Sequence, residues 1–181
     1  MRRIIRLLAL PMLLAGIVPA HADQAVAPTR PVAVLLPIEF ADHATAMEWI
    51  KSECGLPKAV ERDIGEALHH DGVGGDPTSS LASGYVLKVV IDRAYGQKGG
   101  NWSGTKGMSL GLQLFADGVP QRSFEVTAEG RSANPFAGSC TSLEKVSRSA
   151  SRRVSDWLRD PDFAKGDAPL AATPAASAAS R

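Results

Sequence analysis

The sequence has few aromatic residues and no marked excess of basic ones. Phe, Trp and Tyr make up 6% of its 181 residues, so platforms on which nucleic-acid bases could stack are scarce. The net charge is +1, and it falls to −2 when residues 1–22 are set aside, because that segment holds three arginines and no acid. A chain with this charge balance is not expected to bind nucleic acid.

Long hydrophobic runs are missing beyond the start of the chain. Residues 1–22 combine three arginines, an apolar run from Leu7 to Val18 and the small residues Ala20 and Ala22, which is typical of a cleavable signal peptide. We therefore expect export to a bacterial periplasm, with cleavage after Ala22 and no cysteine at that point to carry a lipid. No later run approaches the length of a transmembrane helix, so we expect none in the mature chain.

The remaining chain divides into a lead, one domain and a tail. Residues 23–30 form a short, flexible lead. Residues 161–181 are rich in Ala, Pro and Ser and cannot bury enough apolar surface to offset the entropy of ordering them, so we expect a disordered tail. The intervening residues 31–160 carry regular hydrophobic patterns and predict a single domain.

Hydrophobic periodicity predicts six elements within this domain. Residues 84–95, 108–114 and 123–129 alternate apolar and polar side chains, as strands with one solvated face do. Apolar residues at helical spacing mark two helices, and Thr141 and Glu144 form a capping box at the start of the second. In chain order the elements are strand 32–36, helix 57–70, strands 84–95, 108–114 and 123–129, and helix 142–158, with residues 44–50 ambiguous between a loop and helical turns.

This order predicts an α+β fold, a two-layer sandwich of β-α-β-β-β-α topology. A four-stranded mixed sheet would carry both helices on one face. The first helix is a crossover between two strands, which makes those strands parallel if they are neighbours, and the next two connections reverse direction. Both helices then run the same way, and their first turns lie at the same end of the sheet.

Cysteine is scarce, and the two residues present fit this topology. Cys54 and Cys140 lie far apart in the sequence, so they form no CxxC redox motif. Each precedes a predicted helix, and the topology therefore brings them together at one end of the sheet. An even count in an exported chain favours a disulfide. The alternative is a reactive thiolate, because a helix N-terminus lowers the pKa of a thiol.

No group of residues in the sequence predicts catalysis, a metal site or a cofactor. His69 and His70 are adjacent, and their side chains would diverge by about 100° on a helix. Together with Asp71 and the distant His43 they do not give the three or four converging ligands that a metal needs. We predict no catalytic residues, no metal ligands and no cofactor.

Two surface features are candidates for binding a protein partner. Trp102 stands in a loop of glycines and polar residues, where it either folds back on the core or anchors a partner. Lys145, Arg148 and Arg152 form a cationic face on the last helix, which would meet an acidic partner or lipid headgroups, or else is simply solvated.

Strand alternation also exposes one polar face of the sheet. Ser109, Gln113, Glu125 and Thr127 are predicted to point to solvent there, and the small Gly111 would let another backbone approach. An unpaired edge strand beside this face offers free backbone donors and acceptors. We expect a partner to contact this edge together with the loop that carries the tryptophan.

The arrangement of strand 32–36, helix 57–70, hairpin 106–130 and helix 142–158 resembles small periplasmic α+β domains of envelope assembly and transport-auxiliary lipoproteins. The resemblance covers residues 31–160 and supplies no catalytic residues. It differs in the absence of a cysteine for lipidation. Together with the absence of a convergent catalytic set, it implies a non-enzymatic binding or assembly module of the cell envelope with a protein partner.

The alternative is a small periplasmic enzyme with a site carried by loops near residues 71–83 and 96–106. A deep cleft joining these loops, with His43 or His70 beside an acid, would favour the enzyme. A flat sheet face or a groove would favour the binding module.

Overall fold

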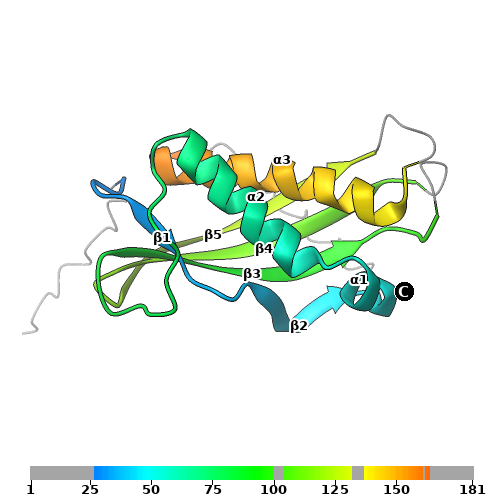
Figure 1. Ribbon diagram of the computed structural model, residues 1–181, viewed down its shortest axis with the longest axis horizontal. Helices are drawn as coiled ribbons and strands as arrows, with labels where there is room; N and C mark the ends of the chain where they lie inside the picture. The colour runs from blue at the N-terminus through cyan, green and yellow to red at the C-terminus, as the bar shows by residue number, and fades with distance from the viewer. Residues whose placement is uncertain (1–26, 100–103, 132–136, 161, 164–181) are drawn as a thin grey trace, which may run out of the picture.

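The computed structural model describes residues 27–99, 104–131, 137–160 and 162–163, and these form an α+β fold of two layers (Figure 1). Five strands lie in these ranges: β1 (Val32–Val34), β2 (Glu39–Ala46), β3 (Tyr85–Tyr95), β4 (Lys106–Ala116) and β5 (Val119–Gly130). The helices of the same ranges are α1 (Glu48–Glu53), α2 (Leu56–His70) and α3 (Ser139–Arg159). The predicted signal peptide, Trp102 and most of the predicted tail lie outside the described residues.

The sheet is mixed, as predicted. Its strands follow the order β1-β3-β4-β5, and β2 also pairs with β3. Both β1 and β2 run parallel to β3, whereas β3, β4 and β5 are antiparallel in succession. Because β1 pairs with the start of β3 and β2 with its end, the two short strands share one edge position. The sheet therefore has five strands where four were predicted, with β1 and β2 along the same side of β3, and α1 is a helix beyond the two predicted.

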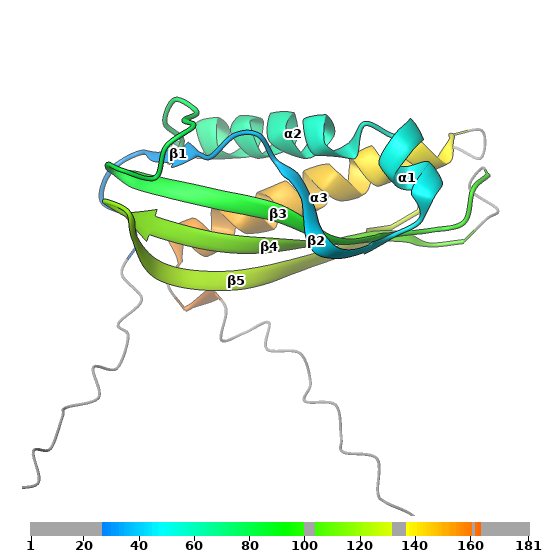
Figure 2. The same cartoon turned by 90° about the horizontal axis from the view of Figure 1, so that it is seen from below.

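Both long helices cover the same face of the sheet, and the opposite face carries no helix in the described part of the chain (Figure 2). They lie side by side and run in the same direction, as predicted. Apolar side chains from β3, β4 and β5 form the core with them, and Trp157 of α3 is the largest fully buried side chain. None of the described helices combines the length and the apolar character that crossing a membrane requires.

The sequence of α2 explains where this helix begins and ends. Gly55 adopts a left-handed conformation (φ 53°) just before it, and Pro57 occupies its first turn, where no intrahelical N–H is needed. Its buried side comes from apolar residues four apart, namely Leu56, Val60, Ile64 and Leu68. The helix stops before Gly72, whose φ of 69° also suits glycine.

The prediction missed β2 entirely, and the reason lies in its burial. None of its eight residues is fully buried, and exposed and half-buried positions follow one another along it. An edge strand without buried side chains leaves no hydrophobic period in the sequence. The ambiguous stretch 44–50 accordingly divides between the end of β2 and the start of α1.

The start of α3 was also predicted wrongly. The helix begins at Ser139, so Thr141 lies within its first turn instead of capping it. Gly138 holds the N-cap position without a side-chain hydrogen bond. The hydroxyl of Ser139 instead donates to carbonyls of the loop after β3, with an oxygen–oxygen distance of 3.1 Å to Gln97. Loop contacts, which the sequence does not show, thus move the start of the helix.

The disulfide between Cys54 and Cys140 is present, as predicted. The Cα atoms of the two residues are 5.0 Å apart, and neither cysteine is free. The bond joins the end of α1, directly before α2, to the first turn of α3. The alternative of a reactive thiolate is therefore wrong, and the bond fixes the first turns of both long helices at one end of the sheet.

Candidate functional site

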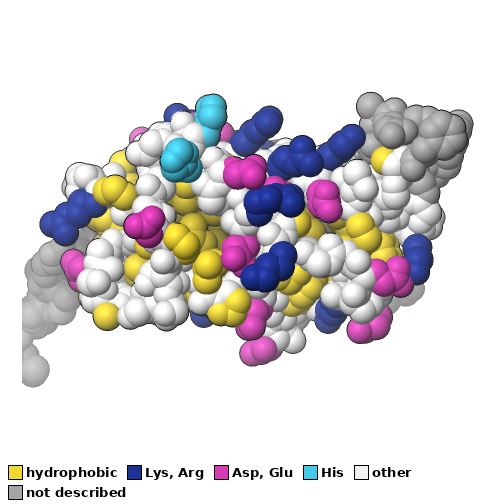
Figure 3. Space-filling model, in the orientation of Figure 1, with side chains coloured by type: hydrophobic (Ala, Val, Ile, Leu, Met, Phe, Trp, Pro, Cys, Tyr) yellow, Lys and Arg dark blue, Asp and Glu magenta, His cyan; other side chains and the backbone are white. Residues whose placement is uncertain are grey.

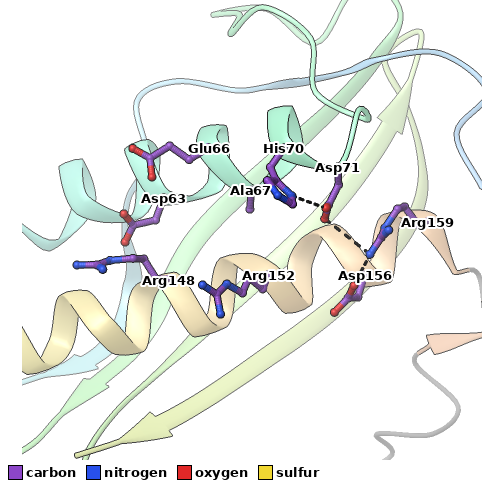
Figure 4. A pocket seen from close by; sticks show the side chains of 9 residues that line it. All are labelled: Asp63, Glu66, Ala67, His70, Asp71, Arg148, Arg152, Asp156 and Arg159. Atoms are coloured by element: carbon purple, nitrogen blue, oxygen red, sulfur yellow. Dashed lines mark hydrogen bonds and ion pairs between the residues drawn. The ribbon is translucent and has the colours of Figure 1, made fainter. Parts of the chain in front are cut away.

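A groove runs between α2 and α3 on the outer surface of the helical layer. Side chains of both charges gather along this line, and histidines lie near the end of α2 (Figure 3). The groove has a volume of about 460 Å³. It is lined by Asp63, Glu66, Ala67, His70, Asp71, Arg148, Arg152, Asp156 and Arg159 (Figure 4). Two of the three predicted cationic residues of α3 thus line one hollow, whereas Lys145 is not part of its lining.

Small polar side chains of α3 form the seam beneath the groove. Ser147, Ser151 and Ser155 follow one another at four-residue spacing, and all three are fully buried. Residues at this spacing share one face of a helix, and the hydrogen bond from Ser155 to Asp71 shows that this face meets α2. Serines are small, so the axes of the two helices can approach closely along this seam.

Asp71 closes the groove at the C-terminal end of α2. Its carboxylate accepts a hydrogen bond from the hydroxyl of Ser155, lies 3.0 Å from Nδ1 of His70 and lies 3.7 Å from the guanidinium of Arg159 (Figure 4). The hydrogen bonds from Ser155 and His70, followed by the charge of Arg159, lower the pKa of Asp71 against the opposing effect of burial. This cluster joins the end of α2 to the last turns of α3.

The opposite half of the groove contains a buried carboxylate. Asp63 is 3% exposed, and its Oδ1 accepts hydrogen bonds from Nε and Nη2 of Arg62 at 3.0 and 2.8 Å. These bonds and the charge of Asp63 raise the pKa of Arg62. Oδ2 of Asp63 and the hydroxyls of Ser147 and Ser151 are buried without a hydrogen-bond partner within the described structure. The floor therefore has unused hydrogen-bonding capacity.

The two rims of the groove carry opposite charges that do not neutralise each other. Arg148 and Arg152 extend from α3, one turn apart, and Glu66 extends from α2 on the other rim (Figure 4). All three are exposed, and within the part of the chain that the structure describes none of them has a salt bridge at 4 Å or less. Glu66 interacts at longer range with Arg62 of its own helix, and the rims thus offer charges outside any salt bridge to a molecule seated between them.

The open face of the sheet holds a second, shallower hollow of about 520 Å³. Gly111 lines it, and a Cβ atom at this position would lie 2.4 Å from Oδ2 of Asp92. Nε2 of His43 is 3.5 Å from Oδ1 of Asp92. Burial raises the pKa of Asp92, and His43 partly opposes this effect. Gln113 and Glu125, both predicted on this face, line the hollow.

Ser109 departs from its predicted exposure. It belongs to the same strand face but is only 1% exposed. Its cross-strand neighbours are Arg93 and Thr127, and its hydroxyl shares a hydrogen bond of 3.0 Å with that of Thr127. Alternation predicts the direction of a side chain but not how far the neighbours cover it.

The two loops considered as an enzymatic site lie at opposite ends of β3. Residues 71–83 lead into this strand and residues 96–99, the described start of the second loop, follow its end, so the strand's 11 residues separate the two by roughly 33 Å. His70 and His43 each lie beside an acid, but one is at the end of α2 and the other is on the open sheet face. Neither of the two hollows described above is lined by residues of both loops. The described residues contain no group of three or more potential metal ligands.

Sequence reasoning missed the acidic rim of the groove. Asp63, Glu66 and His70 recur at helical spacing beside the apolar face of α2, and this row could have been read as a second stripe. The role of Asp71 had no such signal, because it depends on Ser155 and Arg159, more than 80 residues later in the chain. Trp102 lies outside the described residues, and its role stays a prediction.

Comparison with known proteins identifies the fold and no family. No family model matches the chain, and no curated protein sequence matches it. Among solved structures, the PelC dodecamer from Paraburkholderia phytofirmans is similar, with a TM-score of 0.52 and 18% identity over 75% of this chain and 91% of that chain. A Xanthomonas campestris protein of the DUF330 family has a TM-score of 0.51 and 13% identity, over 83% of this chain and 94% of that one. The chain therefore shares its α+β fold with these proteins.

Proposed function

We propose that the protein is a non-enzymatic assembly module of the bacterial cell envelope, exported through residues 1–22. In this proposal the α2–α3 groove is the surface that contacts a protein partner. The observation that carries it is the pair of oppositely charged rims: Arg148 and Arg152 line the α3 side of the groove, Glu66 lines the α2 side, and none of them is in a salt bridge within the described structure. Charges of both signs placed around a groove favour a specific partner over non-specific adsorption.

Three further observations support this proposal. The fold is shared with PelC, which forms a dodecamer, so a domain of this shape can serve multi-subunit assembly. The disulfide suits an oxidising compartment such as the periplasm. The signal-peptide pattern of residues 1–22 agrees with that compartment.

Site-specific photo-crosslinking in intact cells tests the proposal. Arg152 on the groove rim is replaced by p-benzoylphenylalanine, and Lys88 on the open sheet face receives the same replacement as a matched control. Both side chains are exposed and cationic, but they lie on opposite faces of the molecule. We expect a crosslinked protein of the periplasmic fraction at position 152 and not at position 88.

Two results would count against the proposed function. One is retention of the chain in the cytoplasm with residues 1–22 intact, as read by intact-mass measurement. The other is an absence of any protein adduct at position 152 when the protein is present at its normal cellular level.

A further inference from the structure

We propose that the partner seated on the α2–α3 groove is the same groove of a second copy of this chain, in a two-fold symmetric dimer. This inference rests on the proposed function and names the partner of its assembly surface. The unpaired charges are arranged in two parallel strips, one on each helix, and this arrangement determines which contacts a second copy can make.

Each helix contributes mainly one sign of charge to the groove. The strip on α2 is acidic, with Asp63, Glu66 and Asp71, and the strip on α3 carries three arginines, of which Arg159 is paired with Asp156 at 2.6 Å. Within the described residues, the rim charges without a salt bridge are therefore Glu66 on one side, which interacts at longer range with Arg62 of its own helix, and Arg148 and Arg152 on the other. A small anion is a poor occupant, because the carboxylates of the acidic strip line the same hollow and would repel it.

Two-fold symmetry selects one way of placing two such grooves face to face. In a symmetric dimer the rotation axis lies in the plane of contact. An axis across the groove would place acidic strip on acidic strip and basic on basic. An axis along the groove places α2 of each copy over α3 of the other, so that Glu66 of one copy meets Arg148 and Arg152 of its partner. Only the second arrangement places charges of opposite sign against each other across the contact, with Glu66 of each copy meeting the two arginines of the other.

The available area predicts a dimer of modest stability. With 15 residues in α2 and 21 in α3, a rise of 1.5 Å per residue and two helix widths, the face measures about 30 by 20 Å, or about 600 Å². Stable complexes usually bury about 800 Å² per partner. The charges that hold the dimer are exposed, and salt screens them over about 8 Å at physiological ionic strength. Dilution and high salt should therefore both dissociate it.

Charge reversal on the two rims tests the dimer by sedimentation equilibrium of the mature protein. Arg152→Glu alone places Glu opposite Glu66, and Glu66→Arg alone places Arg opposite Arg152, so each variant should dimerise at least about tenfold more weakly. An equimolar mixture of the two variants pairs all four charges again and should recover the dimer. The Glu66→Arg/Arg152→Glu double variant carries both reversed charges, so two identical copies of it pair position 66 with position 152 in both directions and should also dimerise. Lys88→Glu, the same charge change on the open sheet face, should have no effect.

The mixture separates the proposed contact from damage to the fold, because two damaged chains would not restore each other. A wild-type protein that stays monomeric up to millimolar concentration overturns the dimer. So does a mixture that stays monomeric after both single variants have lost association, or an Arg152→Glu variant that dimerises as the wild type does.

The photo-crosslink at position 152 distinguishes this inference from the proposed function. An adduct between two copies of this chain supports both. An adduct with a different envelope protein alone leaves the proposed function standing and overturns the dimer. No protein adduct at all overturns both.

Discussion

At the scale of single residues, Asp71 shows how one side chain can join two helices. It follows the last residue of α2 and binds Ser155 and Arg159 of α3 as well as His70. These partners lower its pKa, which means that they favour the ionised form in the folded state. The free energy that Asp71 contributes therefore depends on pH.

Asp71→Asn should lower the unfolding free energy at neutral pH and should make it less dependent on pH in the acidic range. A carboxylate with a lowered pKa stabilises the folded state above its unfolded pKa, and that contribution is lost as the pH falls through the folded pKa. The difference in unfolding free energy between wild type and variant should therefore be largest near pH 7 and should decrease below about pH 4. Urea unfolding at several pH values measures it, with the exposed Asp76→Asn as control. A difference in unfolding free energy that is the same at pH 7 and pH 3 would show that the ionised carboxylate of Asp71 does not stabilise the fold.

Gly107 is the second residue whose identity the structure explains. A Cβ atom at this position would lie 2.4 Å from the ring of Tyr95, and the hydroxyl of Tyr95 donates to Glu129. Burial, together with this hydrogen bond and the charge of Glu129, raises the pKa of Tyr95 to about 12. Only glycine leaves room for the ring over β4.

Gly107→Ala should displace the ring, break the bond to Glu129 and lower the pKa of Tyr95 toward the ordinary value of about 10. The added methyl group should also cost about 1–3 kcal/mol of unfolding free energy. The ring-carbon NMR shift of Tyr95 reports the titration, with Tyr85 as the internal reference. An unchanged Tyr95 titration in a folded variant would show that the ring does not depend on the glycine.

At the scale of elements, α2 contains a glycine with no structural reason for being there. Gly65 lies in the middle of the helix, is exposed, and has nothing within 4 Å of the place where its Cβ would be. Its backbone is helical and needs no special conformational freedom. Glycine is less favourable than alanine by about 1 kcal/mol in such a position.

Gly65→Ala should therefore stabilise the protein by about 0.5–1 kcal/mol. Chemical denaturation of the mature protein measures the change, and Gly72→Ala serves as the opposite control because Gly72 has a positive φ of 69°. Stabilisation by both substitutions, or by neither, would show that backbone conformation does not control these two sites.

The elements that were predicted correctly share one property, and those that were missed lack it. The strands β3, β4 and β5 and the helices α2 and α3 each place apolar side chains at regular intervals against the core, and this spacing is a periodic pattern in the sequence. The strand β2 buries none of its residues completely, and its pairing with β3 left no pattern to read.

Only the basic rim of the groove could be predicted from the sequence. The arginines of α3 form a visible face, so Arg148 and Arg152 could be identified from the sequence. That Glu66 faces them depends on how α2 and α3 pack, which periodicity does not determine. Contacts such as those of Asp71 with Ser155 and Arg159 join residues distant in sequence and carry no local signal.

At the scale of the whole molecule, the disulfide joins segments that are 86 residues apart. A Cys54→Ser/Cys140→Ser variant should lose about 4 kcal/mol of unfolding free energy, because closing so long a loop restricts the unfolded chain. The fold itself should persist, because Cys54 and Cys140 are only two of the many residues that form or contact the core. Thermal and urea unfolding of the variant, beside the oxidised wild type, check the value. A loss below about 1 kcal/mol would show that the unfolded chain is already compact.

Because α2 and α3 run in the same direction, a partner that binds between them should raise the thermal stability of the entire domain. Two neighbouring helices that run the same way cannot be joined by a short turn, and here the whole of β3, β4 and β5 connects them. The two rims of the groove therefore face each other only while the sheet is intact. Any molecule that binds both rims binds the native state alone, so mass action raises the midpoint of thermal unfolding with its concentration. For a dimer of this chain, the melting temperature itself would rise with protein concentration.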